Sequence, residues 1–336
     1  MSRFVKASLI IVCLLALTGW GTWRYVSAPF QGADPVWVYV PYGSDEEQMT
    51  DSLKSALGDA FGDKVAMMLR VLKISATAAH GAYRIAPGDT ALGVARRLKH
   101  GAQTPVRVTF NNIRTLQQLA DKFSDRMELS AEQFLIAVDS ITSLQGFKPA
   151  EVPSVFLPDT YEFYWTATPA TVVNRLIDYR NRFWSDERRA KAKKLGLTPE
   201  QVAVVASIAE EETNSSVERP VVARLYLNRI HRGMMLQADP TVKWAVGDFS
   251  LRRITSAHLA VDSPYNTYKH AGLPPGPIRI PSASTLDAVL DAPVHNYIYM
   301  CASADFSGRH NFTENYAEHQ RNAAKYRAAL NRRNIK

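Results

Sequence analysis

The sequence predicts an α+β fold, and three observations support this prediction. Runs rich in β-branched and aromatic residues, typical of strands, lie toward the two ends of the chain, and helical patterns dominate between them. Strands and helices do not alternate regularly, which argues against a parallel sheet with crossover helices. The 336 residues are enough for two domains, and an uncharged first segment precedes them. We therefore expect a transmembrane helix, a small α+β subdomain and a larger mixed α+β domain.

Composition excludes several classes of protein. Hydrophobic residues make up 46% of the chain and charged residues 21%, which excludes a disordered, collagen-like or polytopic membrane protein. The 40 Lys and Arg residues exceed the 32 Asp and Glu residues by 8, which suits a polyanion, an anionic membrane surface or a plain soluble enzyme. Cys13 and Cys301 are too few for a disulfide framework, and no cysteine–histidine cluster indicates zinc. We expect no metal and no cofactor.

The N-terminal segment decides the compartment. Residues 7–23 carry no charge, and Arg3 and Lys6 precede them. An apolar run of about 17 to 20 residues spans a bilayer, and positive charge before it favours a cytoplasmic N-terminus. The alternative is a cleaved signal peptide, with residues 26–28 (Val-Ser-Ala) as the cleavage site. Because the run is longer than a typical signal core, we expect residues 1–28 to be a retained anchor and the rest to lie outside the cytosol.

Residues 29–110 are expected to form the small subdomain. Residues 36–40 are strand-like, and Ser44 with Glu47 forms a capping box that opens a helix. A second strand-like run leads into residues 87–90 (Pro-Gly-Asp-Thr) and a helix that ends at Gly101. This strand, turn and helix resembles the LysM carbohydrate-binding module; the alternative is an ordinary strand–turn–helix.

Residues 111–336 are expected to form the larger domain, and carboxylates are its best candidates for chemistry. The chain contains no G-x-S-x-G, H-E-x-x-H or glycine-rich phosphate-binding motif. Cys301 lies in a strand-like run, where a packed thiol is more plausible than a nucleophile. A capping box at Thr198 and Gln201, with proline at the first helical position, opens a helix that ends in three glutamates.

The three glutamates differ in their relation to the apolar stripe that is expected to bury one face of this helix. Glu211 points away from the stripe and should be solvated, whereas Glu210 and Glu212 flank it on opposite sides. Carboxylates at the end of a helix are opposed by the helix dipole. A glutamate that is partly desolvated beside an apolar face keeps its proton near neutral pH. The alternative is a merely polar helix end.

Four further patterns give the sequence its resemblance to a known family. Residues 206–213, 236–242, 265–268 and 272–278 together resemble the endolytic murein transglycosylase family, and the match extends to residues 156–161, His310–Phe312 and His319. The resemblance implies a membrane-anchored enzyme with a LysM-like subdomain. It would cut N-acetylmuramic acid–N-acetylglucosamine bonds within nascent peptidoglycan strands, outside the cytoplasmic membrane, and so end strand elongation.

The resemblance also implies residue roles. The family's catalytic glutamate falls on Glu210, and the second glutamate of its motif falls on Glu212. A lytic transglycosylase uses the C6 hydroxyl of the sugar as nucleophile, so one carboxyl can act first as acid and then as base. The residues that we expect around the cleft, in supporting or sugar-binding roles, are Glu212, Gln237, Asp239, Thr241, Tyr265, Asn266, Tyr268, Asp159 and His310.

The partners are peptidoglycan strands and, at the membrane, peptidoglycan synthases; no nucleic acid is expected. The enzyme would lie in the inner membrane with one span, its N-terminus inside and its catalytic domain in the periplasm. A hydrolytic muramidase is one alternative, and it needs a second carboxylate such as Asp239 or Asp159 near the acid. A non-catalytic wall-binding scaffold, in which Glu210 is structural, is the other.

Overall fold

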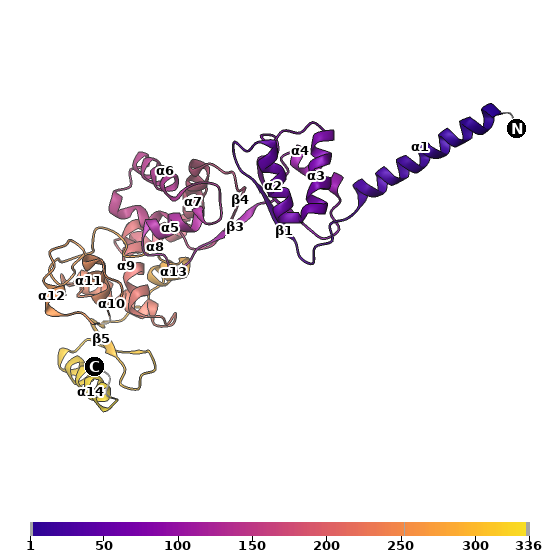
Figure 1. Cartoon of the computed structure of the whole chain (residues 1–336). Helices are drawn as coiled ribbons and strands as arrows, with labels where there is room; N and C mark the ends of the chain where they lie inside the picture. Colours follow the sequence, from indigo (N-terminus) through magenta and orange to yellow (C-terminus); the bar gives the residue numbers. More distant parts are fainter. Residues whose placement is uncertain (1–2, 252, 334–336) are drawn as a thin grey trace. The chain divides into compact units, whose positions relative to one another are not determined.

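The computed structural model describes residues 3–251 and 253–333, and it confirms a mixed α+β fold (Figure 1). The chain divides into two compact units, which we describe separately. Unit 1 comprises residues 1–108 with residues 124–130 and 161–168, and unit 2 comprises residues 109–123, 131–160 and 169–336. The described strands form three two-stranded sheets, β1–β2, β3–β4 and β5–β6.

The first helix, α1 (Arg3–Ser27), is apolar enough over residues 10–27 to cross a membrane. Only 6% of that window is buried inside the structure. The hydroxyls of Thr18, Thr22 and Ser27 donate to carbonyls four residues earlier, at 2.8, 2.8 and 2.6 Å. These polar groups are therefore satisfied within the helix, which is the condition for placing them in an apolar medium.

Unit 1 is built around the antiparallel pair β1 (Val36–Val40) and β2 (Gly81–Ile85), in which Val36 lies opposite Ile85. Its helices are α2 (Glu46–Leu57), α3 (Asp59–Val71) and α4 (Ala91–Lys99). The capping box that opens α2 is formed by Asp45 and Gln48, so the prediction of Ser44 and Glu47 was wrong by one residue. Asp45 is the better cap because its carboxylate oxygen accepts the Gln48 N–H at 2.8 Å.

The predicted strand, turn and helix around residues 83–101 is present, with Thr90 capping α4 through the Gly93 N–H. The strand, however, is the second of its sheet: α2 and α3 lie between β1 and β2 in the chain. The LysM-like character of this subdomain therefore stays a prediction.

Unit 2 is mainly helical, and β3 (Val106–Thr109) and β4 (Thr160–Phe163) lead into and out of its first part. Its helices are α5 (Leu116–Ser124), α6 (Ala131–Leu144), η1 (Pro149–Val155), α7 (Pro169–Phe183), α8 (Asp186–Lys194), α9 (Pro199–Glu212), α10 (Arg219–His231), α11 (Asp239–Val246), α12 (Ser256–Leu259), α13 (Ala283–Leu290) and α14 (Tyr316–Arg332).

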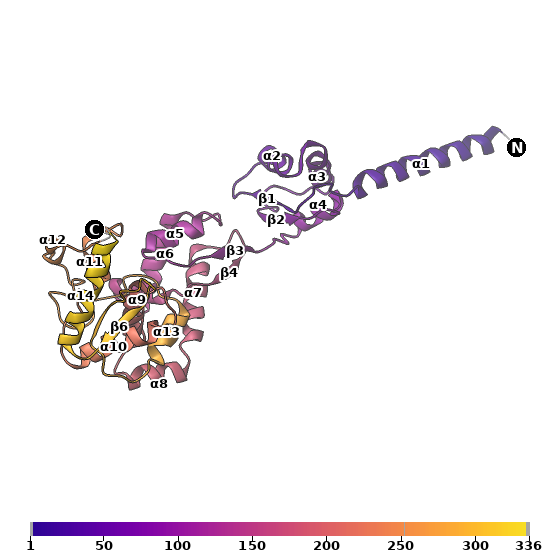
Figure 2. The same ribbon diagram turned by 90° about the horizontal axis from the view of Figure 1, so that it is seen from below.

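Helix α9 lies at the centre of unit 2 (Figure 2). The predicted capping box of Thr198 and Gln201 is present. Every residue from Val202 to Ala209 is buried, so the expectation of a single buried face was wrong. Helices α8, α10, α11 and α13 and the turn η1 all contact α9. A helix surrounded in this way must be largely apolar on all sides, and the run from residue 202 to 209 is, except for Ser207. The Ser207 hydroxyl donates to the Val204 carbonyl at 2.8 Å and accepts the Ile278 N–H at 3.0 Å.

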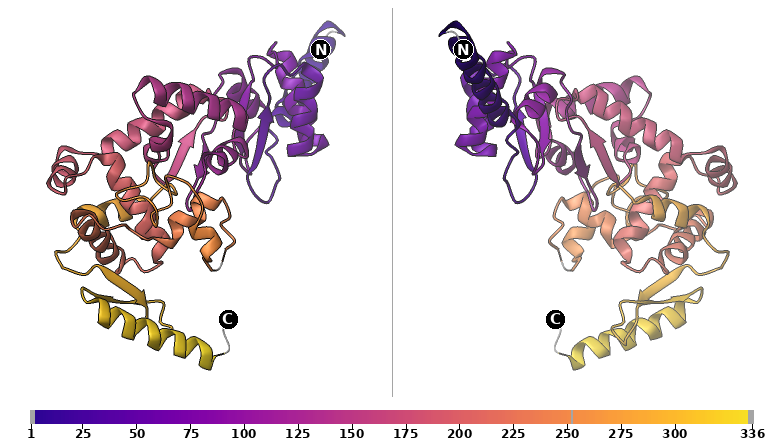
Figure 3. Two further views of the ribbon diagram at one scale, coloured as in Figure 1. Left: turned by 90° about the vertical axis from the view of Figure 1, so that its left-hand side faces the viewer. Right: turned by 90° about the vertical axis from the view of Figure 1, so that its right-hand side faces the viewer.

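The last part of unit 2 is a strand pair and a helix (Figure 3). Strands β5 (Tyr299–Ala302) and β6 (His310–Thr313) are antiparallel, with Tyr299 opposite Thr313. Helix α14 packs against both strands. The Cys301 thiol lies in β5 and is partly buried, and burial raises its pKa.

Candidate active site

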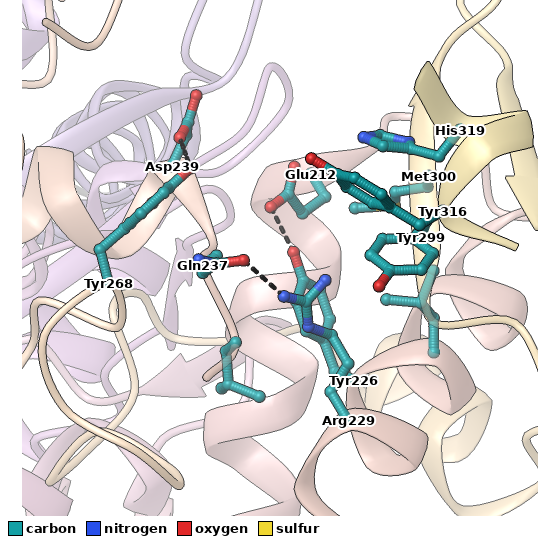
Figure 4. Close-up of a pocket in the computed structure, with 12 residues that line it drawn as sticks. Glu212, Tyr226, Arg229, Gln237, Asp239, Tyr268, Tyr299, Met300, Tyr316 and His319 are labelled. Carbon is teal, nitrogen blue, oxygen red and sulfur yellow. Dashed lines mark hydrogen bonds between the residues drawn. The ribbon is translucent and has the colours of Figure 1, made fainter. Parts of the chain in front are cut away.

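A cleft of about 330 Å³ opens beside the end of α9 (Figure 4). Its walls come from α9, α10, the segment before α11, the loop that holds Tyr268, β5 and α14. The residues that line it are Glu212, Leu225, Tyr226, Arg229, Leu236, Gln237, Asp239, Tyr268, Tyr299, Met300, Tyr316 and His319.

Glu212 is the last residue of α9 and presents its carboxyl group to this cleft. Its Oε1 atom accepts the hydroxyl proton of Tyr226 at 2.6 Å. Burial raises the pKa of Glu212 to about 7, and the negative charge of Asp239 acts in the same direction. The Tyr226 hydrogen bond and the charges of His310 and Lys243 oppose the rise without cancelling it. Glu212 therefore retains a proton over part of its population at neutral pH.

Tyr226 and Arg229 form the floor below Glu212. Burial raises the pKa of the Tyr226 phenol well above its usual value, so the phenol is a neutral donor. The Arg229 guanidinium donates to Gln237 Oε1 at 2.7 Å and to the carbonyls of Ile298 and Met235, both at 2.9 Å. Gln237 itself has φ +52°, a left-handed conformation that costs a non-glycine residue about 1–3 kcal/mol. Stored strain of this kind is typical of functional sites.

Asp239 lies on the opposite side of the cleft from Glu212 (Figure 4). The Tyr268 hydroxyl donates to Asp239 Oδ1 at 2.6 Å. Burial, followed by the hydrogen bond to Asp239, raises the pKa of Tyr268 far above its usual value. One cleft thus holds two carboxyl groups, and each accepts a hydrogen bond from a tyrosine. Asp239, which the sequence motifs placed around the cleft, comes from α11 and not from the helix that carries the three glutamates.

The wall formed by β5 and α14 is aromatic. The Tyr299 and His319 rings are stacked, with centroids 5.3 Å apart and planes 24° apart, and the Tyr316 ring lies 5.5 Å from Tyr299. The Arg229 guanidinium lies 5.9 Å from the Tyr299 ring centre. Burial and the Arg229 charge lower the pKa of His319, so its imidazole is largely neutral at pH 7. A flat wall beside polar groups suits a pyranose ring, which has an apolar face and a hydroxyl rim.

Sequence reasoning missed Tyr226, Arg229, Tyr299 and Tyr316. Tyr226 and Arg229 are three residues apart on one helix, which places their side chains on the same face. That spacing was a usable signal for α10. No local pattern signals Tyr299 and Tyr316, because only the packing of β5 and α14 brings them to the cleft.

Several predicted residues support the cleft without lining it. Thr241 shares a 2.8 Å hydroxyl contact with Thr267, which also accepts the Ala238 N–H at 3.0 Å. The Asn266 amide donates to the carbonyls of Leu259 and Val261 at 3.0 and 2.8 Å. These bonds fix the loops that carry Asp239 and Tyr268. Tyr265 packs against Trp244, with ring centres 5.8 Å apart.

Glu210, Asp159 and His310 also lie outside the cleft lining. Glu210 Oε2 accepts the Ser282 N–H at 2.9 Å and lies 3.2 Å from the Ser282 hydroxyl, at the start of α13. Asp159 accepts a short hydrogen bond from Tyr179. His310 contacts Glu218 through Nδ1 at 2.9 Å. The geometry gives each of these three a structural partner, and it separates Glu210 from the residues that surround Glu212.

Glu211 is not solvated, and that expectation was wrong. Its carboxylate accepts two hydrogen bonds from Arg114, at 3.1 and 2.9 Å, and one from Arg279 at 2.9 Å. The side chain is only 15% exposed. The helical pattern could not predict this, because Arg114 and Arg279 belong to distant segments of the chain that pack over this side of α9.

Among residues 3–251 and 253–333 there is no group of three or more His, Cys, Asp or Glu side chains that could hold a metal ion.

Comparison with known proteins identifies the family. The model of the YceG-like family matches residues 38–325. The chain belongs to the YceG-like family. A YceG-like protein of Listeria monocytogenes, known from a crystal structure, has the same fold at a TM-score of 0.58, with 23% identity over 86% of this chain and 99% of that one.

Two curated relatives are named endolytic murein transglycosylase. The Bacillus subtilis protein is 27% identical over 75% of this chain and 74% of its own length. The Streptococcus pneumoniae (strain D39) protein is 24% identical over 97% of this chain and 65% of its own length, so this chain spans slightly less than two thirds of it. The resemblance found in the sequence motifs is thereby confirmed at the level of the family.

The Glu211 cluster gives a prediction about stability. Glu211→Gln leaves two guanidinium groups without their carboxylate, and we expect the free energy of unfolding to fall by about 2 kcal/mol. Glu187→Gln is the matched control, because Glu187 forms an exposed pair with Lys191 at 3.1 Å and should cost about 0.5 kcal/mol or less. Thermal unfolding of both variants in detergent measures the difference. Equal melting temperatures would contradict the assigned role of the cluster.

Proposed function

We propose that this YceG-like protein is an endolytic murein transglycosylase and that Glu212 is its general acid and base. The observation that carries the proposal is the cleft: its glutamate is desolvated enough to hold a proton near pH 7 and lies among groups suited to sugars. The names of the curated relatives support the same activity. The sequence motif favoured Glu210, and the geometry leads us to assign the role to Glu212 instead.

The reaction needs one proton carrier. Protonated Glu212 gives its proton to the glycosidic oxygen as the bond from this oxygen to the anomeric carbon breaks. The C6 hydroxyl of the sugar that contains this anomeric carbon then bonds to it, and the Glu212 carboxylate takes the hydroxyl proton. The result is a 1,6-anhydro ring, a new 4-hydroxyl end and a glutamic acid ready for the next cycle, with no water consumed. The Tyr226 hydroxyl stabilises the carboxylate between the two steps.

The remaining cleft residues bind and orient the glycan. The Arg229 side chain is held by three hydrogen bonds, so it keeps Gln237 in position at little entropic cost. The stacked rings of Tyr299 and His319 offer a face for a sugar ring. Asp239 places negative charge in the cleft, where positive charge develops on the sugar in the transition state.

Asp239 also supports a second candidate function. A hydrolytic muramidase needs a carboxylate that activates water or attacks the sugar, and Asp239 lines the same cleft as Glu212. We favour the transglycosylase because the named relatives carry that activity and because an intramolecular hydroxyl has the advantage of proximity. The non-catalytic scaffold remains the third alternative, and it predicts that Glu212 can be replaced without loss.

The products separate the two enzymes. We expect digestion of purified glycan strands in ¹⁸O-water to give internal cuts with unlabelled 1,6-anhydro ends, because water does not take part. Such ends are about 18 to 20 mass units lighter than hydrolysed ends. Chelators should leave the rate unchanged. Labelled reducing ends in the mass spectrum would instead establish water as the nucleophile and make Asp239 its candidate base.

Paired substitutions test the acid. We expect Glu212→Gln to lower kcat by about 10² to 10⁴, since it removes the proton donor and keeps the shape of the side chain. Glu210→Gln is the control, and it should keep most of the activity while lowering the melting temperature through its weakened contact with Ser282. Steady-state kinetics and thermal unfolding measure both. Lost activity in Glu210→Gln together with full activity in Glu212→Gln would restore the assignment to Glu210.

The pH dependence follows from the same proton. The acid must be protonated, so we expect kcat to fall as the pH rises through about 7. The folded-state pKa lies above the ordinary value of 4.5, so ionisation of Glu212 costs stability as the pH rises from about 4.5 through about 7. The melting temperature of Glu212→Gln relative to wild type should therefore increase from pH 5 to pH 8. A pH-independent difference would show that Glu212 is not desolvated.

Helix α1 supports a membrane location. We propose that it is a retained inner-membrane anchor with the N-terminus inside, that residues 29–110 and 111–336 lie in the periplasm, and that peptidoglycan synthases are partners there. The protein should fractionate with membranes, and the mature chain should retain residues 10–27. N-terminal sequencing that begins near Pro29 would show cleavage instead.

A further inference from the structure

Helix α1 enters unit 1 without a linker. Val26, in the last turn of α1, is buried in the hydrophobic core of unit 1, and Phe30 is buried in the same core. The Phe30 N–H donates to the Asp89 carbonyl at 2.8 Å, and the Phe30 carbonyl accepts the Gly88 N–H at 3.0 Å. The end of this apolar helix is therefore part of unit 1, and the two cannot separate while the core is intact.

This connection determines how close unit 1 lies to a membrane that α1 crosses. The 25 residues of α1 give it a length of about 37 Å, compared with about 30 Å for the hydrocarbon core of a bilayer. The uncharged stretch ends at Arg24, whose guanidinium lies 5.3 Å from the Trp20 ring centre. Tryptophan and a cation at the end of a span mark the level of the lipid headgroups. Val26 follows Arg24 by two residues, so the surface of unit 1 around the end of α1 lies at this level.

Helix α3 supplies part of that surface. The Lys64 Nζ atom lies 5.0 Å from the Tyr25 ring centre, and α3 contacts α1. Residues three, four or seven positions apart on a helix share a face, so Met67 and Val71 lie on the same face as Lys64. Met67 is 43% exposed and Val71 is 64% exposed. The face of α3 beside the end of α1 therefore presents two large apolar side chains outward.

An apolar groove of about 530 Å³ adjoins this face, because Lys64 lines both. The Phe30 and Phe61 rings, with centres 5.3 Å apart, contribute the aromatic part of its lining. The rest of the lining comes from residues 29–32, which follow α1, and residues 56–60, between and including the ends of α2 and α3. We call the groove together with Lys64, Met67 and Val71 the α1-proximal surface. Contiguous exposed apolar surface of this kind marks a site of interaction with a protein or a membrane.

The charges around the α1-proximal surface favour an anionic partner. Its basic side chains are Arg24, Lys64 and the exposed Arg70. The acidic side chains nearby are Asp59, in the groove lining, and Asp63, which Lys54 already pairs with at 2.8 Å. Positive charge thus predominates beside exposed apolar groups. That combination is typical of helices that lie in the interface of an anionic bilayer.

We propose that the α1-proximal surface is a second membrane contact, through which unit 1 lies on anionic phospholipid headgroups. Met67 and Val71 enter the interfacial layer, and Lys64 and Arg70 pair with lipid phosphate groups. Helix α1 holds the protein to the membrane, and this surface fixes the orientation of unit 1 on it. The proposal rests on the retained anchor proposed above and is independent of the chemistry at Glu212.

The test uses the full chain in nanodiscs of phosphatidylcholine with an increasing fraction of phosphatidylglycerol. Val71→Cys, in a Cys13→Ser/Cys301→Ser background, carries an apolar fluorophore that a lipid spin-labelled at its headgroup quenches on contact. We expect quenching at position 71 to increase with the phosphatidylglycerol fraction. Tyr42→Cys is the matched control, because Tyr42 is 80% exposed in the same unit, beyond the end of β1 that is remote from Phe30. The label at position 42 should not be quenched.

A charge variant tests the attraction to the headgroups. Lys64→Gln/Arg70→Gln should shift the equilibrium between docked and undocked unit 1 about thirtyfold toward the undocked state, since both cations lie near the bilayer surface. Quenching at position 71 should fall accordingly, and high salt should have the same effect on the parent protein. Lys122→Gln/Arg126→Gln is the control, because it removes the same charge from two other exposed positions. It should leave the quenching unchanged.

The outcomes separate this surface from the anchor and from the enzyme. Equal quenching at positions 71 and 42, or equal effects of the two charge variants, would overturn the proposal and leave the surface to a protein partner. Mass spectrometry of the labelled chain shows whether α1 is retained, and a chain that begins near Pro29 would overturn the anchor and this surface together. Quenching at position 71 that depends on phosphatidylglycerol and on Lys64 and Arg70 would uphold the surface even in a protein that cuts no glycan.

Discussion

The burial of residues 202–209 of α9 on all sides is the constraint on which the site depends. A helix covered by neighbours on every side cannot shift along its axis without opening the core. Its last turn therefore delivers three consecutive carboxyl groups to fixed points in unit 2. The helix dipole opposes negative charge there, and burial opposes it further, so each carboxyl group needs its own compensation.

The three carboxyl groups differ in the hydrogen-bond partners that compensate for their burial. Glu211 receives two guanidinium groups, which satisfies a carboxylate fully. Glu210 receives a backbone N–H at the start of α13, with the Arg279 guanidinium 3.8 Å away. Glu212 receives one neutral phenol, which is too weak a partner to offset burial. Burial accordingly raises the pKa of Glu212, at the position that opens into the cleft.

The sequence predicts the helix and the glutamate cluster well, because both depend on local chemistry. The capping box at Thr198, the proline at the first helical position and the apolar run are all readable within one segment. The choice among the glutamates is not readable in this way. It depends on Arg114 and Arg279, which are 97 and 68 residues away from Glu211 in the chain. A helical projection treated the side facing these arginines as solvent and therefore misjudged Glu211.

The aromatic wall of the cleft could not be predicted from the sequence either, because its residues come from separate segments of the chain. Tyr299, Tyr316 and His319 become neighbours only when β5, β6 and α14 dock against α10. Two buried polar links carry out this docking: Arg229 donates to the Ile298 carbonyl, and Glu218 accepts from the backbone and ring of His310. Burial alone would raise the pKa of Glu218, but the His310 donors outweigh it and lower the pKa, so Glu218 is a carboxylate at neutral pH. His310, which the motifs placed around the cleft, thus supports the cleft through the strand that carries it, and the aromatic wall is held by the same helix that supplies Tyr226 to the acid.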